Sequence, residues 1–187
     1  MKPKVVGVVG RNGSGKDEVL NYLQAQCGIA VVSSGDVARD IAKTENIAPT
    51  RENLHDISLR YMKERGNDFF ARRLIAKIEE NSWSDVGITG VRTPHDVEAF
   101  RAHFGDNFWL VAVRVWNPGL RFGRIRSRGT TRDPQTWDAF SEQEQAEERH
   151  FQISRTLQEA EITIDNSGAM SQLHQKIEAS PIWSWIC

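Results

Sequence analysis

The stretch Gly10–Asp17, which reads Gly-Arg-Asn-Gly-Ser-Gly-Lys-Asp, decides the fold. An apolar run, Val5–Val9, comes directly before it, and a helical pattern of Val19, Leu20 and Leu23 comes after it. A glycine-rich loop that joins a strand to a helix is typical of sites that hold phosphate groups on backbone amides. The sequence therefore predicts a buried strand, a phosphate-binding loop and a helix in succession.

The spacing within the loop, a glycine, four residues and then Gly15-Lys16, is that of the P-loop of nucleotide-binding proteins. Its glycines let backbone N–H groups turn inward as a concave nest, and the helix that begins near Gly15 adds its positive dipole end. Lys16 can bridge the outer phosphates of a nucleoside triphosphate. We expect the nucleotide to be held by Gly10, Asn12, Gly13, Ser14, Gly15, Lys16 and Asp17.

Asp17 departs from this pattern, because a serine or threonine normally follows the lysine and holds Mg²⁺ through its hydroxyl. A carboxylate is a harder, charged oxygen ligand, so Asp17 is a candidate ligand for Mg²⁺, directly or through water. It also brings a negative charge near the phosphates, which the metal or Lys16 would have to offset. Two alternatives stay open: a glycine turn that binds nothing, and a loop that binds nucleotide without supporting catalysis.

The composition is that of a globular domain, with 187 residues, 39% of them apolar and 26% charged, long enough for one substantial core. A net charge of −1 gives no overall nucleic-acid signature. Two cysteines, Cys27 and Cys187, make no disulfide framework, so we expect a reducing, cytoplasmic location. We also expect no signal peptide and no membrane span, since no apolar run approaches the required length.

Short apolar runs predict five strands, and helical patterns separate them. The runs cover 5–9, 29–32, 86–91, 108–115 and 162–164. This alternation predicts an α/β fold, a five-stranded parallel sheet with helices on both faces. Ligands bind at the carboxyl ends of the strands in such sheets. The polar residues expected to meet there are Asp36, Arg39, Arg92, Asp165 and Asn166.

The helices between the strands include one insertion. Thr50 is predicted to cap a helix over 51–65, and a second helix over 69–80 carries an apolar stripe. Because both arrive between two strands, we expect them to wall one side of a pocket. A helix, or two, is expected over 137–159. The aromatic tail 181–186 is expected to form a flap on the surface.

A dense arginine cluster lies at positions 121, 124, 126, 128 and 132. On a helix, Arg121, Arg124 and Arg128 share a face, and the polar break 129–134 has the character of a lid that closes over phosphates. A solvated basic face, or a nucleic-acid patch, is the alternative. Trp109 and Trp116 are expected to pack in the core.

Arg39 and Arg92 are candidates to grip an acceptor's own phosphate, because arginine forks match phosphate geometry. Ordinary ion pairing with Asp40 or Asp96 is the alternative. Asp36 could orient the acceptor or a metal-bound water, or it could cap a helix. The third predicted strand closes with Ile88-Thr89-Gly90, so Thr89 stands where an acid that supports Mg²⁺ would be expected.

These motifs resemble the nucleoside monophosphate kinase group of P-loop kinases, which includes adenylate kinase and dephospho-CoA kinase, and most closely a kinase-like branch known mainly from archaea. The resemblance extends to about residue 179. The matching segments are Ser34-Gly35-Asp36 with Arg39, Thr89-Gly90-Val91-Arg92 (where the group has an acid in place of Thr89), Arg124-Ile125-Arg126-Ser127-Arg128, Arg132-Asp133 and Asp165-Asn166-Ser167-Gly168.

The resemblance implies a three-layer P-loop NTPase fold that moves the γ-phosphoryl group of ATP to a nucleotide-like small molecule, with Mg²⁺. It assigns catalysis to Lys16, Arg124, Arg128 and Asp36, acceptor binding to Asp36, Arg39, Arg92 and Arg132, and the adenine side to Asn166. It divides the single domain 1–187 into a core (1–48, 82–120, 160–180), acceptor-site helices (35–81) and a lid (121–135).

Three other functions stay open. A dephospho-CoA kinase would need a hydroxyl acceptor and a base, for which Asp36 is the candidate. A nucleotide-binding regulator would bind ATP without turnover, because Asp17 and Thr89 both alter the metal side. A nucleic-acid-linked ATPase would use the arginine cluster, although the net charge makes nucleic acid a poor expectation.

Overall fold

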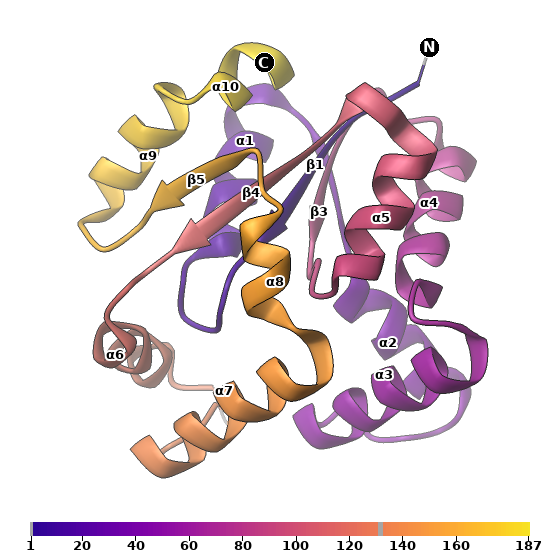
Figure 1. Cartoon of the computed structure of the whole chain (residues 1–187), viewed down its shortest axis with the longest axis vertical. Coiled ribbons are helices and arrows are strands. Elements are labelled where there is room, and N and C mark those ends of the chain that lie inside the picture. The colour runs from indigo at the N-terminus through magenta and orange to yellow at the C-terminus, as the bar shows by residue number, and fades with distance from the viewer. Residues whose placement is uncertain (1, 131–132) are drawn as a thin grey trace.

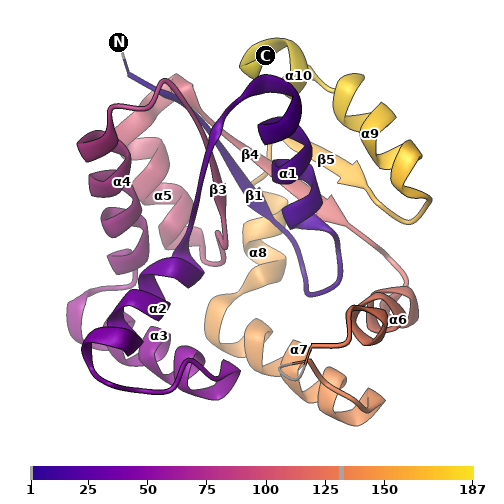
Figure 2. The same cartoon turned by 180° about the vertical axis from the view of Figure 1, so that it is seen from behind.

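The computed structural model describes residues 2–130 and 133–187, and its centre is a five-stranded parallel sheet in the order β2-β3-β1-β4-β5. The strands are β1 (Lys4–Val9), β2 (Ala30–Ser33), β3 (Asp85–Thr89), β4 (Phe108–Arg114) and β5 (Ile162–Asp165). Helices connect the strands and cover the sheet on both sides (Figures 1 and 2). The α/β P-loop architecture expected from the sequence is confirmed.

The helices follow the expected positions closely. In chain order they are α1 (Lys16–Cys27), α2 (Ser34–Thr44), α3 (Arg51–Arg65), α4 (Phe69–Asn81), α5 (Pro94–Phe104), a 3₁₀ turn η1 (Gly105–Asn107), α6 (Pro118–Arg128), α7 (Trp137–Phe151), α8 (Ile153–Gln158), α9 (Met170–Glu178) and α10 (Pro181–Ile186).

Strand β1 shows why the sheet is buried on both faces. Its residues Val5, Val6, Val8 and Val9 are all fully buried. Since side chains alternate along a strand, Val5 and Val9 enter one apolar cluster and Val6 and Val8 enter the other. Each such valine contributes about 1.5–3 kcal/mol by leaving water.

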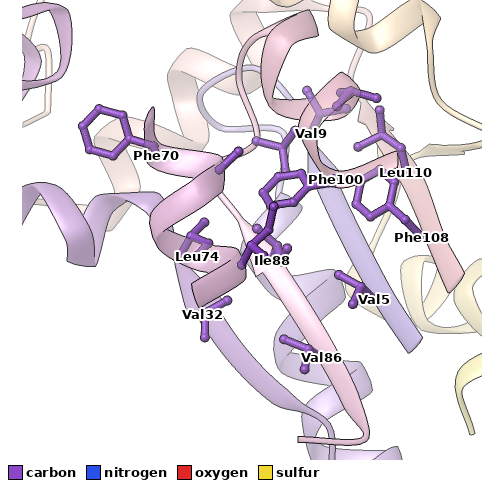
Figure 3. Close-up of a cluster of buried hydrophobic side chains, with 14 of the residues drawn as sticks. Val5, Val9, Val32, Phe70, Leu74, Val86, Ile88, Phe100, Phe108 and Leu110 are labelled. Carbon is purple, nitrogen blue, oxygen red and sulfur yellow. The ribbon is translucent and has the colours of Figure 1, made fainter. Parts of the chain in front are cut away.

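The two clusters define the layers. The first packs β-strand side chains against α2, α4, α5 and α8, and Figure 3 shows it around Leu74, Ile88 and Phe100. The second packs the other face against α1, α9 and α10. Figure 2 shows α1, α9 and α10 together on this side of the sheet.

The insertion between β2 and β3 forms as its capping residues predict. The Thr50 hydroxyl accepts the Asn53 amide at the start of α3. The apolar stripe of α4 is buried through Phe70, Leu74 and Ile78. Thr93 begins α5 with a capping box, as its Thr-Pro sequence predicts.

Two expectations about apolar residues are wrong. The tail is a helix, α10, and its Ile182 and Ile186 are buried in the second cluster rather than lying on the surface. Trp116 is 70% exposed, because it follows the last residue of β4 and the sheet no longer covers it. Trp109 does pack inward, stacked on Trp185 with ring centroids 5.2 Å apart.

The expectation about cysteines is also wrong, because Cys27 and Cys187 form a disulfide. They are 160 residues apart in sequence, but α10 folds back onto the end of α1, and the two Cα atoms lie 5.0 Å apart. That distance is ordinary for a disulfide. Spacing along the chain carries no information about this tertiary contact. Separately, within 2–130 and 133–187 we find no helix both long and apolar enough to span a membrane.

Candidate active site

The glycine-rich loop joins β1 to α1 in the conformation that its sequence predicts. Gly13 and Gly15 have φ angles of 76° and 83°, in the left-handed region that favours glycine. A Cβ at Gly13 would collide with the carbonyl of Arg121, and one at Gly15 would collide with the side-chain amide of Asn166. Only glycine therefore fits at these two positions.

The N-terminus of α1 is arranged for an anion. Gly15 is the N-cap and supplies no side-chain acceptor, so no side chain caps the amides of the first turn. Lys16 begins the helix and makes no ion pair with any residue in the described part of the chain. Free amides, a helix dipole and a cation together favour phosphate binding at this point.

A cavity of about 580 Å³ opens beside the loop at the carboxyl ends of the strands. Its walls come from the P-loop, α2, α3, the start of α4, the connection between β3 and α5, the end of α6 with Thr130 and Asp133, and α7. Lys16 and Asp17 line it on the loop side, and Leu54, Met62 and Phe70 make an apolar wall opposite. The size and mixed lining suit a small organic ligand.

Arg39 and Arg92 both line this cavity, as the sequence predicts. Arg92 makes no ion pair with Asp96; its guanidinium lies 5.2 Å from the centre of the Phe151 ring. The Asp96 carboxylate instead accepts the backbone amides of Arg92 and Thr93. Burial raises the pKa of Asp96, although those amides act in the opposite direction.

The Asp36 carboxylate forms an ion pair with Arg39, and Asp36 is not among the residues that line the cavity. Its role toward an acceptor or a metal-bound water stays a prediction. Ser33, not Asp36, caps α2, because its hydroxyl accepts the Gly35 amide. Asp36 therefore holds Arg39 from the first turn of the same helix.

The arginines of α6 do not share one environment. Arg121 is buried, donates to the Asn12 carbonyl at 3.1 Å and pairs with Glu144 at 2.7 Å. Arg124 donates to the Gly168 carbonyl at 3.2 Å, on the side of the β5–α9 turn. Arg128 alone of these three lines the cavity. The three arginines lie on one helix, as expected, but each contacts a different neighbouring element.

The turn after α6 is held by Asp133. Arg128 donates to its carboxylate through Nε at 2.9 Å and Nη2 at 2.7 Å, and the Thr130 hydroxyl donates at 2.6 Å. Burial would raise the pKa of Asp133, but these donors and the nearby Arg51 lower it below its usual value. Arg132, expected to bind the acceptor, lies outside the described residues.

Asn166 contacts the glycine-rich loop through its side chain. Its side-chain amide donates to the Ser14 carbonyl at 2.8 Å, and the residue is only 5% exposed. The contact that the structure shows is therefore with the P-loop itself. An adenine-side role, as the resemblance implies, stays a prediction.

Three acidic residues of α7 contact the glycine-rich loop, and the sequence analysis does not predict these contacts. Glu144 and Glu148 pair with Arg11 at 3.4 and 2.6 Å. Glu147 accepts from Asn12 at 3.1 Å and from Arg51 at 3.3 Å. Glu144, Glu147 and Glu148 are three and four residues apart, so they lie on one side of a helix, and this spacing is the sequence feature that indicates a shared contact surface.

Asp17 and Thr89, the two departures from the expected metal side, contact each other. The Thr89 hydroxyl donates to a carboxylate oxygen of Asp17 at 2.6 Å. Thr89 is the last residue of β3 and pairs with Val8 of β1, just before the loop begins. The site thus places one carboxylate and one hydroxyl together beside Lys16.

A P-loop after the central strand of a five-stranded parallel sheet, with a cavity at the carboxyl ends of the strands, defines the class of P-loop kinase folds. The model of the AAA domain family matches residues 9–141. The UPF0200 protein of Pyrococcus horikoshii is 33% identical over 176 residues, which cover 93% of this chain and 94% of that protein. The chain belongs to the AAA domain family and to the UPF0200 proteins of archaea, which confirms the expected archaeal kinase-like branch.

Solved structures agree on the architecture. A sugar kinase from Janibacter sp. HTCC2649 has a TM-score of 0.59 at 14% identity, covering 99% of this chain and 96% of that chain. A shikimate kinase from Acinetobacter baumannii has a TM-score of 0.54 at 18% identity, covering 94% and 90%. At these identities the likeness shows the fold alone.

Proposed function

We propose that the chain is an ATP-dependent phosphotransferase that moves the γ-phosphoryl group to a small nucleotide-like acceptor, a nucleoside or deoxynucleoside monophosphate. One observation carries the proposal: the same cavity is lined by the P-loop lysine, Lys16, and by two arginines on other elements, Arg39 and Arg92. A donor phosphate and an acceptor phosphate can then be held in one enclosed space.

The donor side is the loop. The amides of Gly13–Lys16 and the first turn of α1 would hold the triphosphate, and Lys16 would bridge its outer phosphates. Arg128 lines the cavity and would stabilise the charge of the transferred group. The bond between the γ-phosphorus and the bridging oxygen breaks, and a bond to an acceptor oxygen forms.

The acceptor side would be built by the predicted acceptor-site helices within 35–81, together with the β3–α5 connection. Arg39 and Arg92 would grip the acceptor's phosphate through their guanidinium groups. Leu54, Met62 and Phe70 offer an apolar wall against which a base can pack. A segment over 121–135 would act as a lid.

The donor groups beside the loop fit Mg²⁺, because the carboxylate of Asp17 and the hydroxyl of Thr89 are hard oxygen donors in contact with each other. Asp17 is the residue that would hold the metal. When bound, Mg²⁺ would neutralise charge between the phosphates.

A second acceptor class has one observation in its favour. Glu147 lines the cavity beside Asn12 of the loop, and its Oε1 accepts from Asn12 and Arg51, so its carboxylate would have to exchange one of these partners for the proton of a hydroxyl acceptor. Asp36, the base expected from the sequence, faces Arg39 instead. Dephospho-CoA and sugar-like hydroxyl compounds therefore belong in any substrate panel. The third reading, a regulator that binds ATP without turnover, predicts no acceptor at all.

The test is a coupled ADP-release assay with ATP and Mg²⁺ against nucleoside and deoxynucleoside monophosphates, dephospho-CoA and shikimate- and gluconate-like alcohols. Release that depends on a monophosphate is the expected result. Release only with an alcohol would instead support the hydroxyl-acceptor class. ATP binding by calorimetry without release for any acceptor would support the regulator and contradict the proposal.

A further inference from the structure

The contact between Asp17 and Thr89 joins two positions 72 residues apart in sequence. Asp17 is the second residue of α1, directly after the loop lysine, and Thr89 is the last residue of β3. The Thr89 hydroxyl donates to Asp17 Oδ1 at 2.6 Å. The hydrogen bond fixes one carboxylate oxygen and leaves the other oxygen of Asp17 free of this partner.

In the usual P-loop, the residue after the lysine is a serine or threonine and the acid comes from a neighbouring strand. Here the same two groups stand beside each other, but the carboxylate is on the helix and the hydroxyl is on the strand. We propose that Asp17 and Thr89 are the Mg²⁺-binding pair of the nucleotide site with their roles exchanged, Asp17 binding the cation and Thr89 positioning its carboxylate. This inference rests on the proposed function.

The exchange of roles between Asp17 and Thr89 accounts for a threonine, rather than an acid, at the end of β3. An acid at position 89 would place a second carboxylate in hydrogen-bond contact with Asp17, and two like charges at that distance oppose each other's ionisation. A threonine at this position donates a hydrogen bond to Asp17 instead, which holds the carboxylate in place. Each of the two departures from the usual pattern therefore compensates for the other.

Other acids near the loop are already engaged. Asp85 accepts from Ser84 at the start of β3, four residues and about 13 Å from Thr89 along the strand. Asp96 caps α5 through backbone amides. Glu147 and Asp133 are paired with arginines.

Asp17 differs from these acids in its charge balance. It lines the cavity next to Lys16 and makes no ion pair with any residue in 2–130 or 133–187. A carboxylate that no protein cation neutralises is available to a metal ion. Its place in the first turn of α1 also puts it beside the helix N-terminus that would hold the phosphates.

The experiment measures the ATP affinity by calorimetry, once with excess EDTA and once with saturating Mg²⁺. We define the Mg²⁺ enhancement as the affinity with Mg²⁺ divided by the affinity without it. Asp17→Asn keeps the shape but removes the charge, so we expect the enhancement to fall about tenfold or more, while the Mg²⁺-free affinity holds or improves. Thr89→Val should lower the enhancement by about tenfold, and Thr89→Ser should restore it. Electron paramagnetic resonance of Mn²⁺ with ATP gives a second readout of the metal.

The sharpest variant is the double exchange, Asp17→Thr with Thr89→Asp, which recreates the usual arrangement. We expect it to recover most of the enhancement that Asp17→Thr alone loses. Glu18→Gln is the matched control, because Glu18 is acidic, lies in the same first turn and does not line the cavity. Thermal unfolding of each variant verifies that it folds.

Three results would overturn the inference. Full enhancement in Asp17→Asn would show that the metal is held elsewhere. A double exchange no better than Asp17→Thr would refute the exchange of roles. If the wild-type chain bound no ATP in either condition, the proposed function itself would fail, which distinguishes the two failures.

Discussion

Arg92 lies where the β3–α5 connection meets the cavity, with its guanidinium over the ring of Phe151 and its carbonyl accepting from Thr156. This packing fixes the fork of the side chain before any ligand arrives. Preorganised arginine is suited to phosphate, because less side-chain freedom is lost on binding. A substitution of Arg92 therefore tests the acceptor side of the site without changing the glycine-rich loop.

We predict that Arg92→Ala raises the KM for a monophosphate acceptor by about 10- to 100-fold, since a hydrogen-bonded ion pair is worth roughly 1.5–3 kcal/mol. Calorimetric ATP affinity should stay unchanged. Arg126→Ala is the control, because Arg126 is exposed on the same chain and does not line the cavity. An unchanged acceptor KM would remove Arg92 from the site.

For single residues, the sequence predicts which side chains gather at the site better than it predicts which atoms contact each other. Lys16, Arg39 and Arg92 could be placed near one another because each follows a strand end, and parallel strands bring those ends together. The contact between Asp17 and Thr89 could not be predicted, because it depends on the register of β3 against β1 to within one residue. A shift by one residue would turn Thr89 to the opposite face.

Among the elements, α7 is the one that ties the wall of the cavity to the loop. Arg11 of the loop donates to Glu148 of α7 and to Ser154 of α8, and it also forms an ion pair with Glu144 of α7. The partners are half-buried, which lets the charges retain part of their attraction. We infer that the stability of α7 depends on the loop below it.

We predict that Arg11→Ala lets amides in 137–151 exchange with solvent roughly fivefold faster, because a partly exposed ion-pair network is worth about 1 kcal/mol. Hydrogen exchange read by mass spectrometry measures this directly. Arg149→Ala removes an exposed arginine from the same helix and should leave the exchange unchanged. Equal exchange in both variants would show that Arg11 does not hold α7.

Asp133 makes the turn after α6 sensitive to acid. Its pKa is lowered in the folded chain, so its stabilising effect is present above the unfolded pKa of about 4 and is lost as pH falls through the lower folded value. We predict that the difference in unfolding free energy between the wild-type chain and Asp133→Asn shrinks between about pH 4 and pH 2. Urea titrations across this range provide the measurement. A difference independent of pH would contradict the assignment.

The elements themselves were largely predictable, because periodicity and caps such as Thr50 and Thr93 act locally. The surroundings of the α6 arginines were not. A helical repeat places Arg121, Arg124 and Arg128 on one side, but which of them meets Glu144, Gly168 or the cavity depends on elements distant in sequence. The same limit applies to the carboxylates of α7.

For the whole molecule, the disulfide links the C-terminal helix to the end of the P-loop helix. Cys27 is the last residue of α1, and Cys187 follows α10, whose Ile182 and Ile186 fill the core beside α1. The bond closes a loop of 160 residues. Long loops lose the most unfolded-state entropy when they are closed, in the chain-entropy account.

We predict that Cys187→Ser destabilises the oxidised chain by about 2–4 kcal/mol, which corresponds to a fall in Tm of about 2–4 °C for each kcal/mol. Scanning calorimetry measures the shift. Adding a reductant should lower the Tm of the wild-type chain by the same amount and leave the variant unaffected. Identical Tm values for the oxidised and reduced wild-type chain would mean that the bond adds no stability.

The measurement that tests the central claim most directly is transfer of labelled γ-phosphoryl from ATP to a nucleoside monophosphate, with Mg²⁺, in the wild-type chain and in Lys16→Ala. We predict a labelled diphosphate product with the wild-type chain. We also predict that Lys16→Ala loses this product and binds ATP about 10- to 100-fold more weakly. Wild-type chain that binds ATP but labels no acceptor, or a folded Lys16→Ala variant with unchanged ATP affinity, would contradict it.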